Sequence, residues 1–377
     1  MPPAGLYIHV PFCSSVCPYC DFAVTIAGAD RRASYLDALD REIVMARRHH
    51  LSFDTVYFGG GTPSSLPPEQ LGRILSTVES ELDLAAETTL HLEINPDDVS
   101  SESAAAWREL GFSFASLGVQ SFDDSALGFL GRTHSAAGAR RATEILLNTG
   151  FDTVSIDLIF GLPDQCAEDW RLQLETSLSL GAQHISCYQL TIHGGTVFGN
   201  RNARGELAEL GEDDQAEIYH LTHEVLGHAG WLGYEVSNFA VSAEHRSKHN
   251  QKYWDHTPYI GLGPSAHSFS GRTRWWNRPK LRLWTTALAD GRSPVEGEEE
   301  LTDAELFFEA VMLGLRTVEG IDREVLRQRF GNEVVLFNES AVERLANDGY
   351  LRCDDSRIQP TPRGMAVADG MVRTLLL

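Results

Sequence analysis

The chain lacks any apolar run approaching the ~20 residues that a helix needs to cross a bilayer, although 42% of its 377 residues are hydrophobic. It also begins without the basic stretch, followed by an apolar one, that marks a signal peptide. We therefore expect a cytoplasmic protein without a membrane span. Its hydrophobic content is sufficient for a full-size core, and its length suits one large domain with a smaller one.

Positive charge is also scarce in this sequence. Lys and Arg number 31 against 53 Asp and Glu, which gives a formal net charge of −22. A field of this sign repels phosphate backbones and anionic lipid headgroups. Because no long basic patch interrupts it, we expect no nucleic-acid partner.

Cysteine is rare, and the six that occur are unevenly placed. Thiols stay reduced in the cytoplasm, so we expect metal ligands or buried bystanders and no disulfides. Three cysteines are scattered and are expected to be small buried hydrophobes: Cys166, Cys187 and Cys353. The other three form a C-x3-C-x2-C cluster near the start of the chain: Cys13, Cys17 and Cys20.

Up to about residue 192 the sequence alternates short β-rich runs with helical segments, several of which end in glycine. This alternation predicts βα units around a parallel sheet. Periodicity alone leaves open a six-unit open barrel and a doubly wound sheet. The predicted strands are "LYIHV", "TVYFGGG", "TTLHLEINP", "FASLGVQSF", "TVSIDLIFGLP" and "HISCYQLTI".

Beyond residue 193 the pattern weakens to one helix near 212–229 and a stretch rich in Trp, Tyr, His and Gly. "EGEEE" at 296–300 is interpreted as a solvated linker. After it, "TDAE" matches a capping box, and three predicted helices with a short hairpin indicate a winged-helix-like domain. We thus expect three parts, at 1–240, 241–295 and 296–377.

Polar residues mark the predicted ends of four strands. In a parallel barrel, ligands bind at these carboxyl ends. Three glycines in a row would allow a ligand close to the backbone and leave amide groups free. Asp157 lies in an apolar strand, where a carboxylate needs a partner, either a ligand or an arginine. The residues are Gly59, Gly60, Gly61, Thr62, Glu93, Gln120 and Asp157; Arg132, in "LGRTH", could pair with a ligand carboxylate.

Three cysteines at this spacing leave one metal coordination position without a protein ligand. A closed four-iron cluster takes four thiolates, so three thiolates leave one iron open, much as a catalytic zinc keeps an open position. An open iron can chelate the amine and carboxylate of S-adenosylmethionine, and an electron from the cluster can then cleave its sulfonium to give a 5′-deoxyadenosyl radical. We favour this arrangement over zinc, although Cys166 or Cys187 could still supply a distant fourth ligand.

The C-x3-C-x2-C loop, with Tyr19 before its last cysteine and "GGGTP" after the second strand, resembles the radical S-adenosylmethionine superfamily. "YIHVPFC", "EINPDD", "GVQSFDD", "IDLIFGLP" and "HNQKYW" are similar to the oxygen-independent coproporphyrinogen III oxidase family over nearly the whole chain. This resemblance implies an α/β fold, a partial (βα)6 barrel with a C-terminal winged-helix-like domain.

Two features resemble the HemW-type heme chaperones of that family more than its HemN-type oxidases. Phe22 occupies the position where the oxidases carry an additional cysteine, and Cys13 lies close to the start of the sequence. The resemblance implies a 4Fe-4S cluster on Cys13, Cys17 and Cys20, and S-adenosylmethionine near Tyr7, Gly59 and Glu93. It leaves open whether a second S-adenosylmethionine lies near the residues that match the oxidases' second site: Tyr19, Gln120, Arg132 and Asp157.

The "HNQKYW" segment, His249–Trp254, resembles the HNxxYW motif of the chaperones and implies heme binding by His249. From spacing alone, a rigid seam between domains, in which each histidine donates to a carbonyl, is the alternative. We expect a heme chaperone that binds heme or porphyrin and a heme-accepting protein. Two alternatives remain: a decarboxylating porphyrinogen oxidase, and another radical enzyme such as a methyltransferase or a heme-degrading enzyme.

Overall fold

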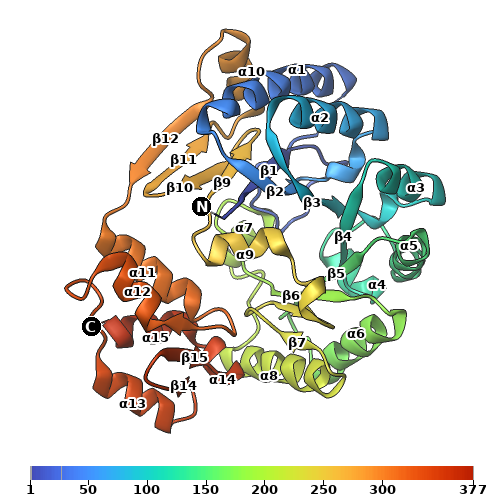
Figure 1. Ribbon diagram of the computed structural model, residues 1–377. Helices are drawn as coiled ribbons and strands as arrows, with labels where there is room; N and C mark the ends of the chain where they lie inside the picture. Colours follow the sequence, from blue (N-terminus) through green and yellow to red (C-terminus); the bar gives the residue numbers. More distant parts are fainter. Residues whose placement is uncertain (1, 27, 377) are drawn as a thin grey trace.

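A twelve-stranded sheet forms the body of the molecule in the computed structural model, which describes residues 2–26 and 28–376 (Figure 1). Its centre consists of six parallel strands in the order in which they occur in the chain. All six strands predicted from the sequence are present. They are β1 (Ala4–Val10), β2 (Ser52–Gly60), β3 (Asp83–Ile94), β4 (Phe112–Gln120), β5 (Thr153–Phe160) and β6 (His184–Gln189).

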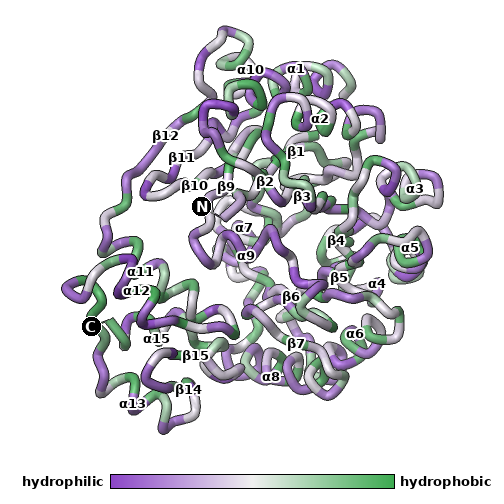
Figure 2. The backbone as a smooth tube through the Cα atoms, viewed as in Figure 1, coloured by the Kyte–Doolittle hydropathy of each residue, from purple (hydrophilic) through white to green (hydrophobic). Residues whose placement is uncertain are grey.

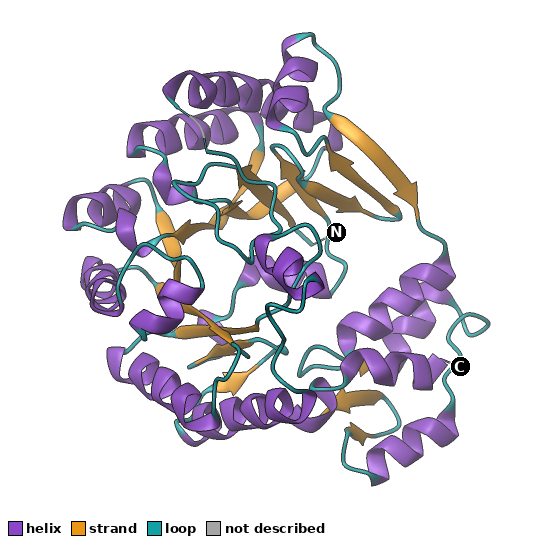
Figure 3. Ribbon diagram, turned by 180° about the vertical axis from the view of Figure 1, so that it is seen from behind, coloured by secondary structure: helices purple, strands orange, loops and turns teal. Residues whose placement is uncertain are grey.

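Helices cover the outer face of these strands (Figure 3). Local sequence explains their limits: Ser100 and Ser135 accept backbone hydrogen bonds at two N-termini, and Gly150 and Gly181 end two helices in the left-handed conformation. The helices are α1 (Ala29–Ala46), α2 (Pro68–Glu81), α3 (Ser101–Glu109), α4 (Asp124–Phe129), α5 (Ala136–Thr149) and α6 (Ala167–Leu180). Short 3-10 turns are η1 (Arg47–His49), η2 (Pro63–Ser65), η3 (Pro96–Asp98) and η4 (Ala243–His245).

The strand order resolves the choice that periodicity left open. A doubly wound sheet reverses its order at a switch point, whereas here β1 to β6 follow one another in a single direction. The sheet curls without closing, because within the described residues β1 pairs with β2 and β9 (Tyr259–Leu262) and not with β6. The fold is therefore the expected α/β partial barrel.

The second half of the chain extends both edges of this barrel. β9 adds parallel to β1, and three antiparallel strands continue from it; two short strands extend the other edge beyond β6. These strands are β7 (Leu232–Gly233), β8 (Asn238–Ala240), β10 (His267–Ser270), β11 (Thr273–Asn277) and β12 (Val295–Glu300). The helices of this part of the chain are α7 (Val197–Ala203) and α8 (Glu212–His228), which precede β7, and α9 (Lys248–Trp254) and α10 (Leu281–Ala289).

The interpretation of "EGEEE" as a linker is wrong, because residues 296–300 belong to the edge strand β12. Its glutamates are largely exposed, and Figure 2 shows it as a hydrophilic segment. Backbone pairing with β11 holds the strand in place, and Arg274 Nη1 on β11 lies 3.0 Å from Glu299 Oε1. Charged edge strands are common because they discourage edge-to-edge aggregation.

The C-terminal part has its own hydrophobic core and the expected winged-helix-like elements. The capping box at Thr302 begins its first helix, as the sequence predicted. Its elements are α11 (Asp303–Gly314), β13 (Ile321–Asp322), α12 (Arg323–Phe330), α13 (Glu339–Asn347), β14 (Leu351–Cys353), β15 (Arg357–Pro360), α14 (Pro362–Met365) and α15 (Ala368–Leu376). The division of the chain at residues 240 and 295 stays a prediction. Throughout residues 2–26 and 28–376, no helix has the length and apolarity that crossing a membrane requires.

A buried carboxylate joins α1 to the added strands. Glu42 is only 5% exposed and accepts hydrogen bonds from the Gly263 amide at 2.7 Å, Asn277 Nδ2 at 2.6 Å and Trp284 Nε1 at 3.1 Å. Burial raises the pKa of Glu42 to about 8, and the three donors only partly oppose this. Glu42 thus links segments more than 200 residues apart in the sequence.

We expect Glu42→Gln to lower the free energy of unfolding by about 1–3 kcal/mol, because the new amide nitrogen faces a donor and leaves it unpaired. The raised pKa of Glu42 also sets a pH dependence. The folded state binds the extra proton, so this stabilising contribution is complete below about pH 4.5 and is lost as the pH rises through about 8. Urea unfolding followed by circular dichroism across this range measures both effects. If the free energy of unfolding changed with pH in the same way in the parent and in Glu42→Gln, the raised pKa would not belong to Glu42.

Candidate cluster and ligand site

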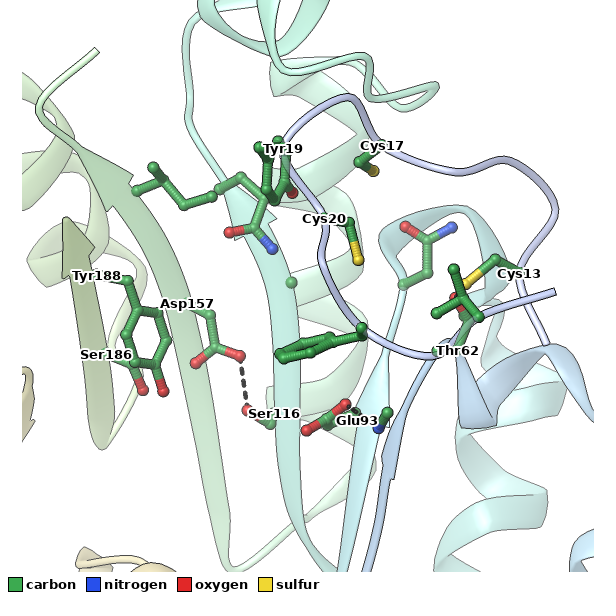
Figure 4. Close-up of a pocket in the computed structure, with 18 of the residues that line it drawn as sticks. Cys13, Cys17, Tyr19, Cys20, Thr62, Glu93, Ser116, Asp157, Ser186 and Tyr188 are labelled. Atoms are coloured by element: carbon green, nitrogen blue, oxygen red, sulfur yellow. Dashed lines mark hydrogen bonds between the residues drawn. The ribbon is translucent and has the colours of Figure 1, made fainter. Parts of the chain in front are cut away.

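A cavity of about 530 Å³ opens at the carboxyl ends of the parallel strands, beneath the loop that carries the three clustered cysteines (Figure 4). It extends into the barrel as far as Ser247 and Asn250, at the start of α9. Cys13, Cys17 and Cys20 all line it. The strand-end position is where this type of barrel places its ligands.

Backbone contacts fix the cysteine loop at both ends and in its middle. The Cys13 amide donates to the Thr25 carbonyl at 3.1 Å, and the Cys20 amide donates to the Cys17 carbonyl at 3.1 Å. The Phe198 amide at the start of α7 donates to the Pro18 carbonyl at 2.9 Å. The loop is therefore held in place by its own backbone and by α7, which is distant in the sequence.

Two side chains donate hydrogen bonds to the thiol sulfurs. Thr62 Oγ1 lies 3.4 Å from Cys13 Sγ, and Arg132 Nη1 lies 3.6 Å from Cys17 Sγ. Burial raises the pKa of the Cys13 thiol and of the Cys20 thiol. Donors of this kind stabilise metal-bound thiolates and tune clusters.

The donor set fits a cluster better than a single ion. Across the described chain, no group of three or more His, Cys, Asp or Glu side chains converges closely enough to hold one metal ion. The three thiols instead border one wide cavity, which Arg132 also lines, and the buried Nε of Arg132 has no hydrogen-bond partner among the described residues. Thiolate ligands with cationic and hydroxyl donors suit a four-iron cluster, so Cys13, Cys17 and Cys20 are the residues that would hold it.

The glycine run does not present free amides, which corrects one expectation. The Gly60 amide donates to Glu93 Oε2 at 3.0 Å, the Gly61 amide to the Val10 carbonyl at 2.9 Å and the Thr62 amide to the Phe12 carbonyl at 2.8 Å. A Cβ on Gly61 would lie 2.9 Å from this neighbouring backbone. These glycines are required because two chain segments cross closely; Gly60, Gly61 and Thr62 also line the cavity.

Glu93 lies at the end of β3 and faces the cavity. Its Oε1 accepts from the Tyr57 hydroxyl at 2.8 Å, and burial raises its pKa to about 7. Tyr7 and Gly59 are not among the cavity-lining residues; they lie behind it, where a Cβ on Gly59 would come within 2.9 Å of both Glu93 and Tyr7. Their predicted ligand role would therefore act through Glu93.

Asp157 is hydrogen-bonded to serine hydroxyls, whereas the sequence suggested that its partner would be an arginine or a ligand. Ser116 Oγ donates to Oδ2 at 2.7 Å, and Ser155 Oγ donates to Oδ1 at 3.0 Å. Burial raises the pKa of Asp157, opposed by these hydroxyls and that of Ser186. No arginine pairs with it among the described residues, so it remains available to a ligand cation or hydroxyl (Figure 4).

Tyr19, Gln120 and Arg132 line the same cavity near the cysteine loop. Arg132 Nη2 donates to Asn95 Oδ1 at 2.7 Å and to the Gly118 carbonyl at 3.1 Å. Gln120 adopts a left-handed backbone conformation (φ 65°), which is uncommon for a residue with a Cβ. The structure therefore brings these three predicted residues together with the cysteines, Glu93 and Asp157.

His249 lies outside this group. It is 1% exposed and does not line the cavity. Thr55 Oγ1 lies 2.9 Å from Nδ1, and the Tyr253 hydroxyl lies 2.9 Å from Nε2, so both ring nitrogens are engaged. Burial, with His91 and Lys252 nearby, lowers the pKa of His249 well below its usual value. In this conformation the histidine is part of a packed seam, and its role as heme ligand stays a prediction.

Sequence reasoning missed the serines that surround Asp157. Ser116 and Ser155 occupy paired positions on β4 and β5, and Ser186 pairs with Asp157 across β5 and β6. A serine in the middle of each of three apolar strands was the available signal, since a buried hydroxyl needs a partner. Tyr188 and the half-exposed His193 also line the cavity and were not predicted.

Comparisons with known proteins identify the family and agree with the fold. Residues 7–174 match the Radical SAM superfamily, and residues 301–367 match the HemN C-terminal domain. Among solved structures, the fold resembles coproporphyrinogen III oxidase (HemN) from Escherichia coli, with a TM-score of 0.85 and 21% identity over 99% of this chain and 89% of that one.

Curated relatives match over nearly their whole length. The heme chaperone HemW of Bacillus subtilis is 33% identical over 95% of both chains, and that of Mycobacterium tuberculosis is 36% identical over 99% of this chain and 95% of its own. The mouse mitochondrial radical S-adenosyl methionine domain-containing protein 1 is 34% identical over 99% of this chain and 87% of its own.

Proposed function

Because the chain belongs to the HemW heme chaperone family of the radical S-adenosylmethionine superfamily, we propose that it carries a 4Fe-4S cluster, binds S-adenosylmethionine and heme, and delivers heme to acceptor proteins. The supporting observation is the set of three thiols above one strand-end cavity that also contains Glu93, Arg132 and Asp157. When bound, the cluster and S-adenosylmethionine supply one-electron chemistry.

The position of each group of residues indicates its proposed role. Cys13, Cys17 and Cys20 would hold the cluster, while Arg132 and Thr62 donate to two of the sulfurs. Glu93 and Asp157 offer carboxylate oxygens to the cationic or hydroxyl groups of S-adenosylmethionine. Gln120 and Arg132 line the same cavity and match the residues expected around a second S-adenosylmethionine molecule.

A combined binding and product assay tests the chaperone proposal. The protein is reconstituted with iron and sulfide without oxygen, then given S-adenosylmethionine with either heme or coproporphyrinogen III. We expect heme to bind and coproporphyrinogen to remain unchanged, because Phe22 replaces the oxidases' additional cysteine and is 64% exposed on the loop. Formation of protoporphyrinogen would replace this proposal with an oxidase.

Glu93→Ala should weaken S-adenosylmethionine binding by roughly 1–3 kcal/mol, the usual cost of losing a hydrogen bond to a charged group. Glu93 faces the cavity beneath the cysteine loop, whereas Glu87 on the same strand is exposed and provides the matched control. Isothermal titration calorimetry on the reconstituted protein measures both variants. An unchanged affinity in Glu93→Ala would place the ligand elsewhere in the cavity.

A further inference from the structure

Large apolar side chains that are open to solvent line the mouth of the strand-end cavity. Val16 and Phe22 of the cysteine loop are 51% and 64% exposed, and Tyr188 in β6 is 42% exposed (Figure 4). All three are among the residues that line the cavity. Exposed apolar side chains that gather in one place indicate a binding surface. The roles proposed above for the cysteines, Glu93 and Asp157 make no use of them, so the mouth is suited to a further ligand with apolar surface.

His193 lines the same cavity, on the loop that follows β6. Its side chain is half-exposed, and its Nδ1 faces Asp21 Oδ2 at 3.6 Å. Asp21 directly follows Cys20, so the imidazole lies against the cysteine loop. A carboxylate beside Nδ1 favours the tautomer that carries its proton there and leaves the lone pair on Nε2. Within residues 2–26 and 28–376, no hydrogen bond engages Nε2.

The backbone around His193 is fixed by the start of α7. The His193 carbonyl accepts from the Thr196 hydroxyl at 2.8 Å, and Thr196 Oγ1 accepts from the Gly199 amide at 2.9 Å. The neighbouring Phe198 amide donates to the carbonyl of Pro18 in the cysteine loop at 2.9 Å. One short helix therefore positions both the histidine and the loop with Asp21, which keeps the imidazole at the cavity mouth.

The ring nitrogens of His193 differ in their contacts from those of two neighbouring histidines. His184 also lines the cavity, but the Ser155 hydroxyl lies 2.8 Å from its Nδ1 and the Tyr234 hydroxyl lies 2.7 Å from its Nε2. His249 lies outside the cavity, and both of its ring nitrogens are engaged. Among the described residues that line the cavity, His193 is thus the histidine with a ring nitrogen open to a metal.

A single histidine does not hold a free metal ion. In the part of the chain that the structure describes, no three or more His, Cys, Asp or Glu side chains converge on one ion. An iron porphyrin brings four nitrogen ligands of its own and takes an axial ligand from the protein. Its flat apolar ring would also contact Phe22 and Tyr188 at the mouth. An apolar peptide would use these two side chains but not the pair of His193 and Asp21.

We propose that His193 ligates the iron of a second heme, at the open mouth of the strand-end cavity, and that this heme exchanges with acceptor proteins. The lone pair of Nε2 bonds to the iron and displaces a water molecule, and no electron is transferred. Asp21 orients the ring and raises its basicity as a ligand. His249 is 1% exposed, so a heme on it would be out of an acceptor's reach, whereas His193 is accessible. The proposal rests on the heme binding of the proposed function, but the site requires neither the cluster nor S-adenosylmethionine.

Titration with hemin, followed by difference spectra at the Soret band, tests the second site in the reconstituted and in the cluster-free protein. We expect two phases in the parent: a tight phase that is lost in His249→Ala and a weaker phase that is lost in His193→Ala. His228→Ala removes an exposed histidine at the end of α8 and should retain both phases. Iron-free protoporphyrin IX has no metal to ligate, so it should bind the parent and His193→Ala equally.

Asp21→Asn provides a second readout, because it keeps the shape of the side chain and removes its charge. Hemin affinity in the weaker phase should fall by about tenfold, at the lower end of the usual effect of losing such a carboxylate. The iron–histidine stretching band of the ferrous protein, measured by resonance Raman spectroscopy, should move to lower frequency. A purely structural Asp21 would leave this band unchanged. Heme transfer to apomyoglobin should also slow by about tenfold in His193→Ala.

Three results would contradict these expectations, and they are distinguishable. A single phase in the parent that His193→Ala leaves unchanged would overturn the second site and leave heme binding by His249 intact. An equal loss of hemin and of iron-free protoporphyrin IX in His193→Ala would overturn ligation of the iron. No hemin binding by the parent, under conditions in which apomyoglobin takes up hemin, would instead overturn the proposed function.

Discussion

Iron content should fall to a small fraction of the parent's when Cys13, Cys17 or Cys20 is replaced by serine. A 4Fe-4S cluster holds about four irons and four sulfides, and three protein thiolates are the fewest that keep it bound with one iron open. The three sulfurs border one cavity on a loop fixed by the backbone of Thr25 and Phe198. Anaerobic reconstitution, followed by iron and sulfide analysis and the visible absorption spectrum, measures the loss.

The remaining cysteines supply the controls for this experiment. Cys187 is 2% exposed in β6, as expected, whereas Cys166 and Cys353 are exposed and the expectation that they are buried is wrong; none of the three lines the cavity. Serine at Cys166 or Cys353 should leave the iron content within error of the parent's. If either of these two variants, or Cys187→Ser, lost as much iron as Cys13→Ser, the cluster would have a fourth protein ligand and no open iron.

The barrel could be predicted because its strands carry a local signal. Each apolar run between helical segments became one parallel strand, and the glycines at positions 150 and 181 ended helices as expected. The curvature of the sheet was not predictable from periodicity, since the same βα units also build a doubly wound sheet. β12 was missed because four glutamates in six residues have no strand propensity, and backbone pairing with β11 forms the strand instead.

The site was predictable in its residue types but less so in its contacts. Cys13, Glu93 and Asp157 lie at the strand-end cavity because the carboxyl ends of parallel strands meet there. Ser155 is on the same strand as Asp157, but Ser116 comes from β4, so nothing local in the sequence pairs Ser116 with Asp157. Likewise, the glycine run indicated exposed amides, but the crossing of residues 10–12 occupies the amides of Gly61 and Thr62, and Glu93 from β3 occupies that of Gly60.

Replacing His249 by alanine should remove most of the bound heme, provided that the chaperone motif works as proposed. In the structure, Thr55 and Tyr253 occupy both ring nitrogens, so iron must displace one of them before it is ligated. A neutral imidazole has one lone pair available for iron, and in the tautomer that carries its proton on Nδ1 the lone pair on Nε2 accepts from the Tyr253 hydroxyl, which then competes with iron. Tyr253→Phe should therefore tighten heme binding by about two- to tenfold, the equivalent of the ~0.5–1.5 kcal/mol that a hydrogen bond contributes.

The opposite changes in heme affinity expected for His249→Ala and Tyr253→Phe distinguish an iron ligand from a packing residue. His91 is also 1% exposed, and its ring lies 6.3 Å from that of His249, so His91→Ala is the matched control for a cavity in the same seam. Heme titration monitored at the Soret band should show loss in His249→Ala, gain in Tyr253→Phe and little change in His91→Ala. A purely structural His249 predicts another pattern, in which all three variants lower thermal stability and none alters the Soret spectrum. Under that outcome the half-exposed His193, which lines the strand-end cavity near Asp21, becomes the next histidine to replace, because its ring is already accessible.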